Sequence, residues 1–272
     1  MKRISILTFG VASYGVFFLT FLYLIAFLGN LQQTALVQWM PWLADLVPYS
    51  IDAGREPGPL ALALVINLGL IALFGIQHSV MARIGFKAWL KCYLPAPAER
   101  SVYVLISSLL LIFLFWQWRP MPEVVWAAES TVGVAIGWTV FAAGFGIVLL
   151  STFLIDHFDL FGLKQVWLQF IGKPPEAPRF VTPLLYRLVR HPLYLGWLLA
   201  FWGGPVMTSG GLVFAAATTA YILIAIRFEE KDLAHFLGTE YAEYRKRVPM
   251  LIPWPGRRFV NKGQGVEGHE AR

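Results

Sequence analysis

Cysteine and charge are both scarce in this chain, and each shortage excludes something. The 272 residues include a single cysteine, Cys92, so an intramolecular disulfide and a cysteine-based metal cluster are excluded. Only 14% of the residues are charged, whereas an ordinary soluble domain has roughly 25%. The composition therefore argues against a water-soluble fold.

Apolar residues take the place of the missing charge. They make up 57% of the chain and include 11 Trp and 21 Phe, many of them near the ends of apolar runs, as in the aromatic belts at membrane surfaces. A helix needs about 20 residues to cross the hydrocarbon core of a bilayer. Six apolar segments are candidates: 4–28, 58–77, 101–118, 132–155, 193–207 and 211–228.

These segments predict an all-α fold, a polytopic transmembrane bundle of about five to six helices. The first is too long for the apolar core of a signal peptide, roughly 7–15 residues, so we interpret it as a retained helix. The fifth, 193–207, is short and contains Gly203-Gly204-Pro205, so whether it crosses fully is open. We predict one integral-membrane domain over 1–256, with a short cytoplasmic helical region at its end, and a polar, disordered tail over 257–272.

Positive residues indicate how the bundle sits in the membrane. If the N-terminus is cytoplasmic, the outer loops are 29–57, 119–131 and 208–210, and only Arg55 and Arg119 of the 22 Lys and Arg residues fall in them. This asymmetry predicts cytoplasmic N- and C-termini, in what we expect to be a bacterial inner membrane. Because the net charge of +6 follows the spans and forms no basic face, we expect contacts with membrane lipids and none with nucleic acid.

The same topology places ionisable side chains at the cytoplasmic ends of several segments. Ionisable groups at such depth are costly and mark functional sites by default. Several helix ends at one level can build a shared pocket, although a helix cap, a backbone hydrogen bond or a solvated helix end would also account for each group. The groups are His78 after segment two, Asp156 and His157 after segment four, Arg190 and His191 before segment five, and Arg227, Glu229 and Glu230 after segment six.

The run that starts at Arg190 is the most informative of these. Pro192 suits the first turn of a helix, so the residues before it lie at a helix N-terminus, where free N–H groups and the helix dipole favour an anion. On the last apolar segment, Arg227 and Glu230 are spaced to share one helix face. Such a site suits a ligand with both a carboxylate and an ammonium group, and a zwitterionic amino-acid cofactor has that description.

The C-terminal half resembles the isoprenylcysteine carboxyl methyltransferase superfamily. The resemblance covers about residues 186–254 and rests on four motifs, which are quite specific as a set: Arg190-His191-Pro192-x-Tyr194-x-Gly196, Arg227-x-Glu229-Glu230, Gly238-x-x-Tyr241-x-x-Tyr244 and Arg247-Val248-Pro249-x-x-Ile252-Pro253. The N-terminal half is similar to the branch that contains methanethiol S-methyltransferases and NnrU-like proteins, in the runs Gln77-His78-Ser79-Val80-Met81-Ala82-Arg83, Glu99-Arg100-Ser101-x-Tyr103 and Leu154-Ile155-Asp156-His157-Phe158-Asp159.

This resemblance implies a membrane methyltransferase that uses S-adenosyl-L-methionine, without a nucleotide-binding α/β domain. We expect the acceptor to be a small thiol, methanethiol, and the product to be dimethyl sulfide. The residues expected to bind the cofactor are Arg190, His191, Tyr194, Gly196, Arg227, Glu229, Glu230, Tyr241 and Tyr244.

Methyl transfer to a thiol needs a thiolate, and a free cysteine thiol has a pKa of about 8.5. A base or a cation near the thiol is therefore expected. The candidates for the base are His78 and the pair Asp156–His157, and Arg83 is the candidate for stabilising the developing anion. The reaction requires no metal, and we expect none.

Two alternatives stay open at this stage. One is a related methyltransferase that acts on a prenylcysteine carboxylate or another thiol or lipid acceptor. The other is a non-enzymatic membrane protein, either an NnrU-like accessory protein or a transporter, although a transporter needs polar groups near the membrane midplane. The sequence leaves the oligomeric state open.

Overall fold

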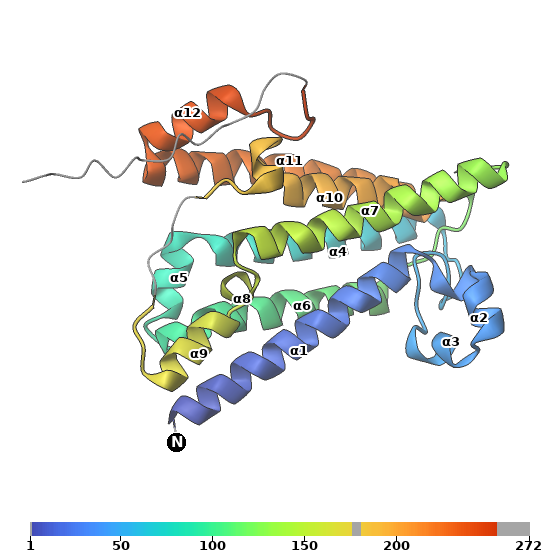
Figure 1. Ribbon diagram of the computed structural model, residues 1–272. Coiled ribbons are helices and arrows are strands. Elements are labelled where there is room, and N and C mark those ends of the chain that lie inside the picture. Colours follow the sequence, from blue (N-terminus) through green and yellow to red (C-terminus); the bar gives the residue numbers. More distant parts are fainter. Residues whose placement is uncertain (1, 176–180, 255–272) are drawn as a thin grey trace, which may run out of the picture.

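The computed structural model describes residues 2–175 and 181–254, and shows a bundle of long helices (Figure 1). The predicted tail, 257–272, lies outside the described residues. The elements in chain order are α1 (Lys2–Leu28), η1 (Leu31–Gln33), α2 (Ala35–Trp39), α3 (Trp42–Leu46), α4 (Leu60–Ala82), α5 (Ile84–Leu90), η2 (Ala96–Ala98), α6 (Glu99–Gln117), β1 (Val124–Ala127), α7 (Thr131–Ile155), α8 (His157–Leu160), α9 (Leu163–Ile171), η3 (Leu184–Arg187), α10 (Pro192–Trp202), β2 (Val206–Thr208), α11 (Ser209–Leu237) and α12 (Thr239–Arg247).

Five of the helices, α1, α4, α6, α7 and α11, are long and apolar enough to cross a membrane. Their outward faces carry large apolar side chains, such as Leu19, Val65 and Val132, each about two-thirds exposed. A helix that is apolar on its outside as well as its inside suits a lipid environment. The chain is therefore an integral membrane protein with an all-α bundle, and the predicted fold class is confirmed.

Two of the predicted spans end too early. The helix predicted to end at residue 77 continues to Ala82, so His78 lies within α4 and not at its end. The last apolar segment continues as α11 to Leu237, so Glu229 and Glu230 are also within a helix. Polar residues do not stop a helix by themselves, because many of them have good helix propensity.

The bundle has two distinct ends. Figure 1 shows α5, α8, α9 and α12 at the end where α1 begins, and α2 and α3 at the other. We call these the proximal and the distal end. The Lys and Arg asymmetry predicts that the proximal end faces the cytoplasm.

The path of segment 193–207 is unlike that of the other spans. The helix α10 has 11 residues, a length of about 16 Å, or about half of the hydrocarbon core. It ends at Trp202, where Gly203 is extended and Gly204 has a φ of 103°. The chain continues as the strand β2, which pairs antiparallel with β1 between α6 and α7. The segment therefore reaches the distal end, with only its first part helical.

The two short strands are a feature that the apolar pattern does not predict. They are tied to the distal loops by Asp52, which is 8% exposed. Its carboxylate accepts hydrogen bonds from the Thr208 hydroxyl at 2.8 Å and the Asn30 amide at 3.1 Å. Burial raises the pKa of Asp52 to about 6. The nearby Glu123 also raises this pKa, whereas the hydrogen bond from Thr208 lowers it.

Close backbone contact holds α10 against α7. A Cβ atom on Gly196 would lie 2.8 Å from the Gly144 carbonyl oxygen and 2.8 Å from the Val148 nitrogen. Small residues allow helices in a membrane to approach in this way. Gly196 was predicted to bind the cofactor, and the structure gives it a packing role at the α7–α10 interface.

We expect Gly196→Ala to destabilise the protein by about 1–3 kcal/mol, because the added methyl overpacks this interface. The matched control is Gly146→Ala on α7, where a Cβ atom meets nothing within 4 Å. Thermal unfolding in detergent measures both variants. Equal unfolding temperatures for the two would show that the α7–α10 contact is not as tight as described.

Candidate active site

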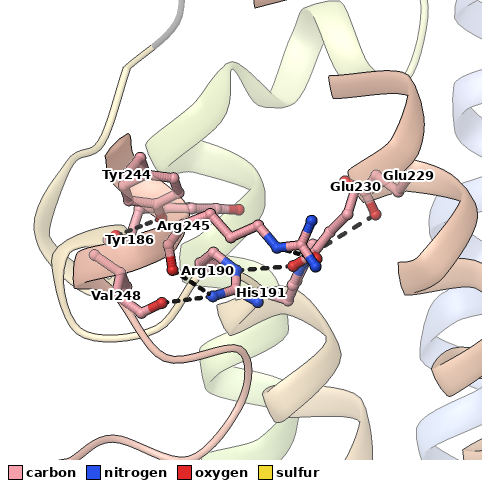
Figure 2. A network of polar contacts seen from close by, with 8 residues as sticks. All are labelled: Tyr186, Arg190, His191, Glu229, Glu230, Tyr244, Arg245 and Val248. Atoms are coloured by element: carbon pink, nitrogen blue, oxygen red, sulfur yellow. Dashed lines mark hydrogen bonds and ion pairs between the residues drawn. The ribbon is translucent and has the colours of Figure 1, made fainter. Parts of the chain in front are cut away.

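A buried ionic network lies at the proximal end, between the start of α10 and the last third of α11 (Figure 2). The Glu230 carboxylate accepts a hydrogen bond from Arg190 Nε at 2.8 Å. The same oxygen lies 3.1 Å from His191 Nε2. The side chains of Arg190 and Glu230 are 10% and 8% exposed, so each charge depends on the other for compensation.

The remaining donors of Arg190 hold the C-terminal segment in place. Its Nη1 donates to the carbonyl oxygens of Val248 at 2.6 Å and Arg245 at 3.1 Å. The backbone adds two hydrogen bonds, from Arg190 N to Pro249 O and from His191 N to the next carbonyl along the chain. The two motifs that begin at Arg190 and Arg247 therefore form one structural unit.

Glu229 lies beside this network but is less enclosed. Its side chain is 45% exposed, and one carboxylate oxygen is 3.9 Å from His191 Nδ1. The same carboxylate interacts with the hydroxyl of Tyr194, one turn into α10. Glu230 is already engaged by Arg190, His191 and Arg245, so Glu229 is the acid with capacity left for a ligand.

Two adjoining cavities lie within the bundle beside this network. The first, of about 220 Å³, has Tyr194, Tyr221, Phe214 and Ile222 in its wall, and we call it the α11 chamber. The second, of about 240 Å³, is lined by residues of α1, α6 and α7 among others, and we call it the α1 chamber. The walls common to both chambers are Leu24, Phe74, His78, Leu111, Leu193 and Trp197.

Among the described residues of this shared wall, His78 is the ionisable one. The hydroxyl of Tyr103 lies 2.7 Å from its Nε2 and 3.0 Å from its Nδ1. Ser107 approaches Nδ1 at 3.3 Å, and the Phe74 ring stacks on the imidazole with centroids 5.3 Å apart. His78 is thus held by side chains of α4 and α6 at the boundary between the chambers.

Arg83 is engaged elsewhere. Its Nη1 is 2.9 Å from Asp232 Oδ2, and its guanidinium lies over the ring of Phe228, 5.2 Å from the centroid. Both partners belong to α11, so Arg83 ties the end of α4 to α11. It is not among the residues that line either chamber.

The pair Asp156–His157 forms a separate cluster at the end of α7. Tyr14 contacts His157 Nε2 at 2.8 Å and Thr152 contacts Nδ1 at 2.8 Å, so both ring nitrogens have partners. Burial lowers the pKa of His157, against the charge of Asp156. The ring stacks on Phe153 with centroids 4.2 Å apart, and it does not line either chamber.

The Asp156 carboxylate points to the surface. It is 2.7 Å from Lys164 Nζ and accepts a hydrogen bond from the Asp159 N–H at 3.1 Å. Burial alone raises the pKa of Asp156, but these two hydrogen bonds outweigh it and lower the pKa. The predicted single pocket is therefore only partly seen: His78 and Tyr194 share a cavity, and the Asp156–His157 pair lies apart from it.

Of the nine residues expected to bind the cofactor, Tyr194 alone is among the described residues that line the chambers. Three of the others also lie outside the hydrogen bonds and ion pairs around Glu230. Tyr241 and Tyr244 are 1% and 2% exposed in a core with Val248, where they hold α12 against α11. Burial raises the pKa of both, and the Tyr244 hydroxyl donates to the Tyr186 carbonyl oxygen at 2.6 Å. Arg227 is exposed on α11. The spacing along the helix placed Arg227 beside Glu230, but in the structure Arg190 is the arginine that pairs with Glu230.

Sequence reasoning missed two tyrosines of the site. Tyr103 was noted within a motif but given no role, and Tyr221 was not noted. Tyr221 lines the α11 chamber, and its hydroxyl accepts a hydrogen bond from Ser79 at 3.3 Å. The sequence did contain a signal for such a partner, because Ser79 lies next to His78 within an apolar span, where a polar group needs a hydrogen-bond partner.

Comparison with known proteins identifies the family. The chain is 50% identical to methanethiol S-methyltransferase 1 of Bradyrhizobium diazoefficiens over 246 residues, which cover 90% of this chain and 81% of that protein. The chain belongs to the methanethiol S-methyltransferase family. It is 47% identical to the member from Crocosphaera subtropica, over 95% of both chains. It is 46% identical to the member from Mycobacterium tuberculosis, over 94% of this chain and 99% of that protein.

No family model and no solved structure matches the chain. The matches to the family members extend over nearly the whole length, so they include both chambers and the ionic network. The resemblance to methanethiol S-methyltransferases expected from the motifs is confirmed, and with it the expectation of a membrane methyltransferase that takes its methyl group from a donor molecule. The roles of individual residues and the absence of a metal stay predictions.

Proposed function

We propose that this protein transfers a methyl group from S-adenosyl-L-methionine to methanethiol and releases dimethyl sulfide. The observation that carries the proposal is the position of His78 in the wall shared by two chambers, one of which is also lined by Tyr194, whose hydroxyl interacts with the carboxylate of Glu229. Family membership supports the reaction and the acceptor.

The polar groups around the α11 chamber fit the donor molecule. S-adenosylmethionine carries an ammonium, a carboxylate and sugar hydroxyls. Glu229 has an exposed carboxylate to accept hydrogen bonds from an ammonium or a hydroxyl. The first turn of α10, at Leu193 and Tyr194, offers backbone N–H groups and a positive dipole end to a carboxylate.

In this proposal the residues of the ionic network divide into two groups. Glu229, His191 and Tyr194 contact the donor. Arg190 and Glu230 are positioning residues, because their hydrogen bonds go to each other and to the C-terminal segment. The methyl donor, when bound, supplies an electrophilic methyl group on a sulfonium.

The chain's own contribution is to deprotonate and position the thiol. Methanethiol in the α1 chamber loses its proton to His78, and a donor held at Glu229, His191 and Tyr194 would supply the methyl group that the sulfur accepts. Tyr103 holds the imidazole in place through its hydroxyl, 2.7 Å from Nε2. Positioning two reactants in this way contributes roughly 7–11 kcal/mol in favourable cases.

The membrane setting suits both reactants. With the proximal end in the cytoplasm, as the distribution of Lys and Arg favours, the charged donor reaches Glu229 from the cytosol of a bacterial cell. Methanethiol is small and apolar, so it enters from the lipid or from water. The bilayer excludes water from the apolar chamber where the thiolate forms.

The direct test uses the purified full-length chain in detergent, with S-adenosylmethionine and methanethiol. Gas chromatography of the headspace is expected to detect dimethyl sulfide in an amount equal to the S-adenosylhomocysteine formed. Folded protein that binds S-adenosylmethionine but forms no dimethyl sulfide would overturn the assignment of the acceptor.

A further inference from the structure

The α1 chamber is larger than methanethiol requires. We propose that the enzyme also S-methylates larger apolar thiols, up to the size of 1-butanethiol and thiophenol, and rejects thiols that carry charged groups. This inference rests on the proposed function and extends its range of acceptors.

The volume of the chamber supports the first half of the proposal. At about 240 Å³, it exceeds the roughly 150 Å³ of an engineered apolar cavity that binds benzene. Methanethiol has one carbon and fills only a small part of such a space. The chamber therefore has room for an aromatic ring or a four-carbon chain attached to the reacting sulfur.

The walls of the chamber are apolar and aromatic, which favours such acceptors. Five phenylalanine and tryptophan rings contribute to them, and they offer broad flat surfaces to an alkyl chain or a phenyl group. Each buried methylene improves the binding of an apolar ligand about fourfold. The five rings are those of Phe17, Phe21, Phe74, Phe161 and Trp197.

The hydroxyl groups in the wall are already bonded to the protein. Ser108 donates to the Val104 carbonyl oxygen at 2.8 Å, and Thr20 to the Val16 carbonyl oxygen at 2.7 Å. Thr152 donates to the Leu149 carbonyl oxygen at 2.7 Å. A ligand inside the chamber thus finds apolar contact and few hydrogen-bond partners.

This lack of polar partners supports the second half of the proposal. A charged group loses its hydration on entry, which costs much more than an apolar contact returns. Arg100 is the charged side chain among the described wall residues; its Nε donates to the Leu160 carbonyl oxygen at 2.9 Å, and its guanidinium lies 5.5 Å from the Tyr103 ring centroid. Among the described residues, the wall holds no carboxylate to pair with the ammonium group of a zwitterionic thiol such as cysteine or homocysteine.

The reaction with a larger thiol balances in the same way as with methanethiol. The thiol proton goes to His78, a bond forms between the thiol sulfur and the methyl carbon, and the bond from that carbon to the sulfonium sulfur breaks. The electron pair of the broken bond stays on the donor sulfur, which becomes a neutral thioether. The products are butyl methyl sulfide and methyl phenyl sulfide.

The experiment compares kcat/KM for methanethiol, ethanethiol, 1-butanethiol, thiophenol and homocysteine, with products measured by gas or liquid chromatography. We expect 1-butanethiol and thiophenol to react with a kcat/KM at least equal to that of methanethiol, and homocysteine to give only background. Background rates for 1-butanethiol and thiophenol, with methanethiol methylated normally, would overturn this inference alone. Background rates for every thiol would overturn the proposed function as well.

A variant of α6 links the acceptor range to this chamber. Ser108 lines the α1 chamber only, so Ser108→Phe fills part of it. We expect the ratio of kcat/KM for 1-butanethiol to that for methanethiol to fall at least tenfold. The matched control is Leu109→Phe on the same helix, whose side chain is 51% exposed on the outer face, and which is expected to keep the ratio of the unmodified protein.

An unchanged ratio in folded Ser108→Phe would contradict the assignment of the chamber. If circular dichroism shows that this variant is unfolded, Thr20→Phe takes its place, because Thr20 lines the same chamber from α1. The same fall in the ratio is expected for that variant.

Discussion

Glu230→Ala is expected to abolish measurable binding of S-adenosylmethionine and to lower the stability of the folded protein. The substitution leaves Arg190 buried without its counter-charge, at a site where the two side chains are 10% and 8% exposed. Breaking a buried ion pair by removing one partner costs about 3–5 kcal/mol. Arg190 also holds the carbonyls of Val248 and Arg245, so the C-terminal segment is expected to loosen with it.

Two further variants separate the roles of the acids. Glu229→Ala is expected to weaken cofactor binding, measured by calorimetry, with little change in unfolding temperature, because Glu229 is 45% exposed and holds no buried charge. Glu243→Ala is the control for a surface ion pair: its partner Lys246 is 2.8 Å away and 72% exposed. Such pairs contribute about 0–1 kcal/mol.

The result that would contradict this division is specific. If Glu230→Ala keeps both its unfolding temperature and its cofactor affinity, the buried network is not the element that shapes the site. If Glu229→Ala keeps its affinity, the ammonium of the donor is bound elsewhere.

The sequence was sufficient to predict the long apolar helices and the polar residues toward their ends, because both follow from local composition. It could not predict which residues face each other. Spacing along α11 placed Arg227 beside Glu230, but Arg227 points outward and Arg190, from another helix, meets Glu230. Such a choice depends on how α10 packs against α11, and no local pattern contains that information.

His78 and His157 also show that local sequence does not predict which side chains line a cavity. His78 and His157 both follow apolar runs at the same predicted level of the membrane. Both histidines have hydrogen-bond partners at both ring nitrogens, but His157, between Tyr14 and Thr152, lines neither chamber. The structure places His78 on the wall of two cavities. A cavity arises where side chains of several helices fail to fill the space between them, so it is a property of the whole bundle.

The role of the C-terminal motif was likewise only partly predictable. Its tyrosines, Tyr241 and Tyr244, have the spacing of a helix face, which fits a binding surface and a packing surface equally well. Their burial in a core with Val248 favours packing. The motif therefore supports the site by fixing α12 and the segment after it, to which Arg190 is bonded.

His78→Gln is expected to lower kcat with methanethiol by a factor of about 10²–10⁴, the usual contribution of a general base. Cofactor affinity is expected to persist, because the donor's polar contacts lie at Glu229 and the start of α10. Tyr103→Phe, which removes the hydroxyl 2.7 Å from Nε2, is expected to have a smaller effect in the same direction. His235→Gln, at an exposed position near the end of α11, is the matched control and is expected to match the unmodified protein.

The pH dependence distinguishes a base from a residue that only supports the fold. Without His78 the reaction depends on thiolate already present in solution. Below the thiol pKa, each increase of one pH unit raises the thiolate fraction about tenfold. The rate of His78→Gln is therefore expected to rise steeply from pH 6 to pH 9, roughly tenfold per unit, whereas the unmodified enzyme depends less on pH over the same range. A uniform loss of rate with an unchanged pH profile would mean that another group removes the proton and that His78 shapes the wall between the chambers.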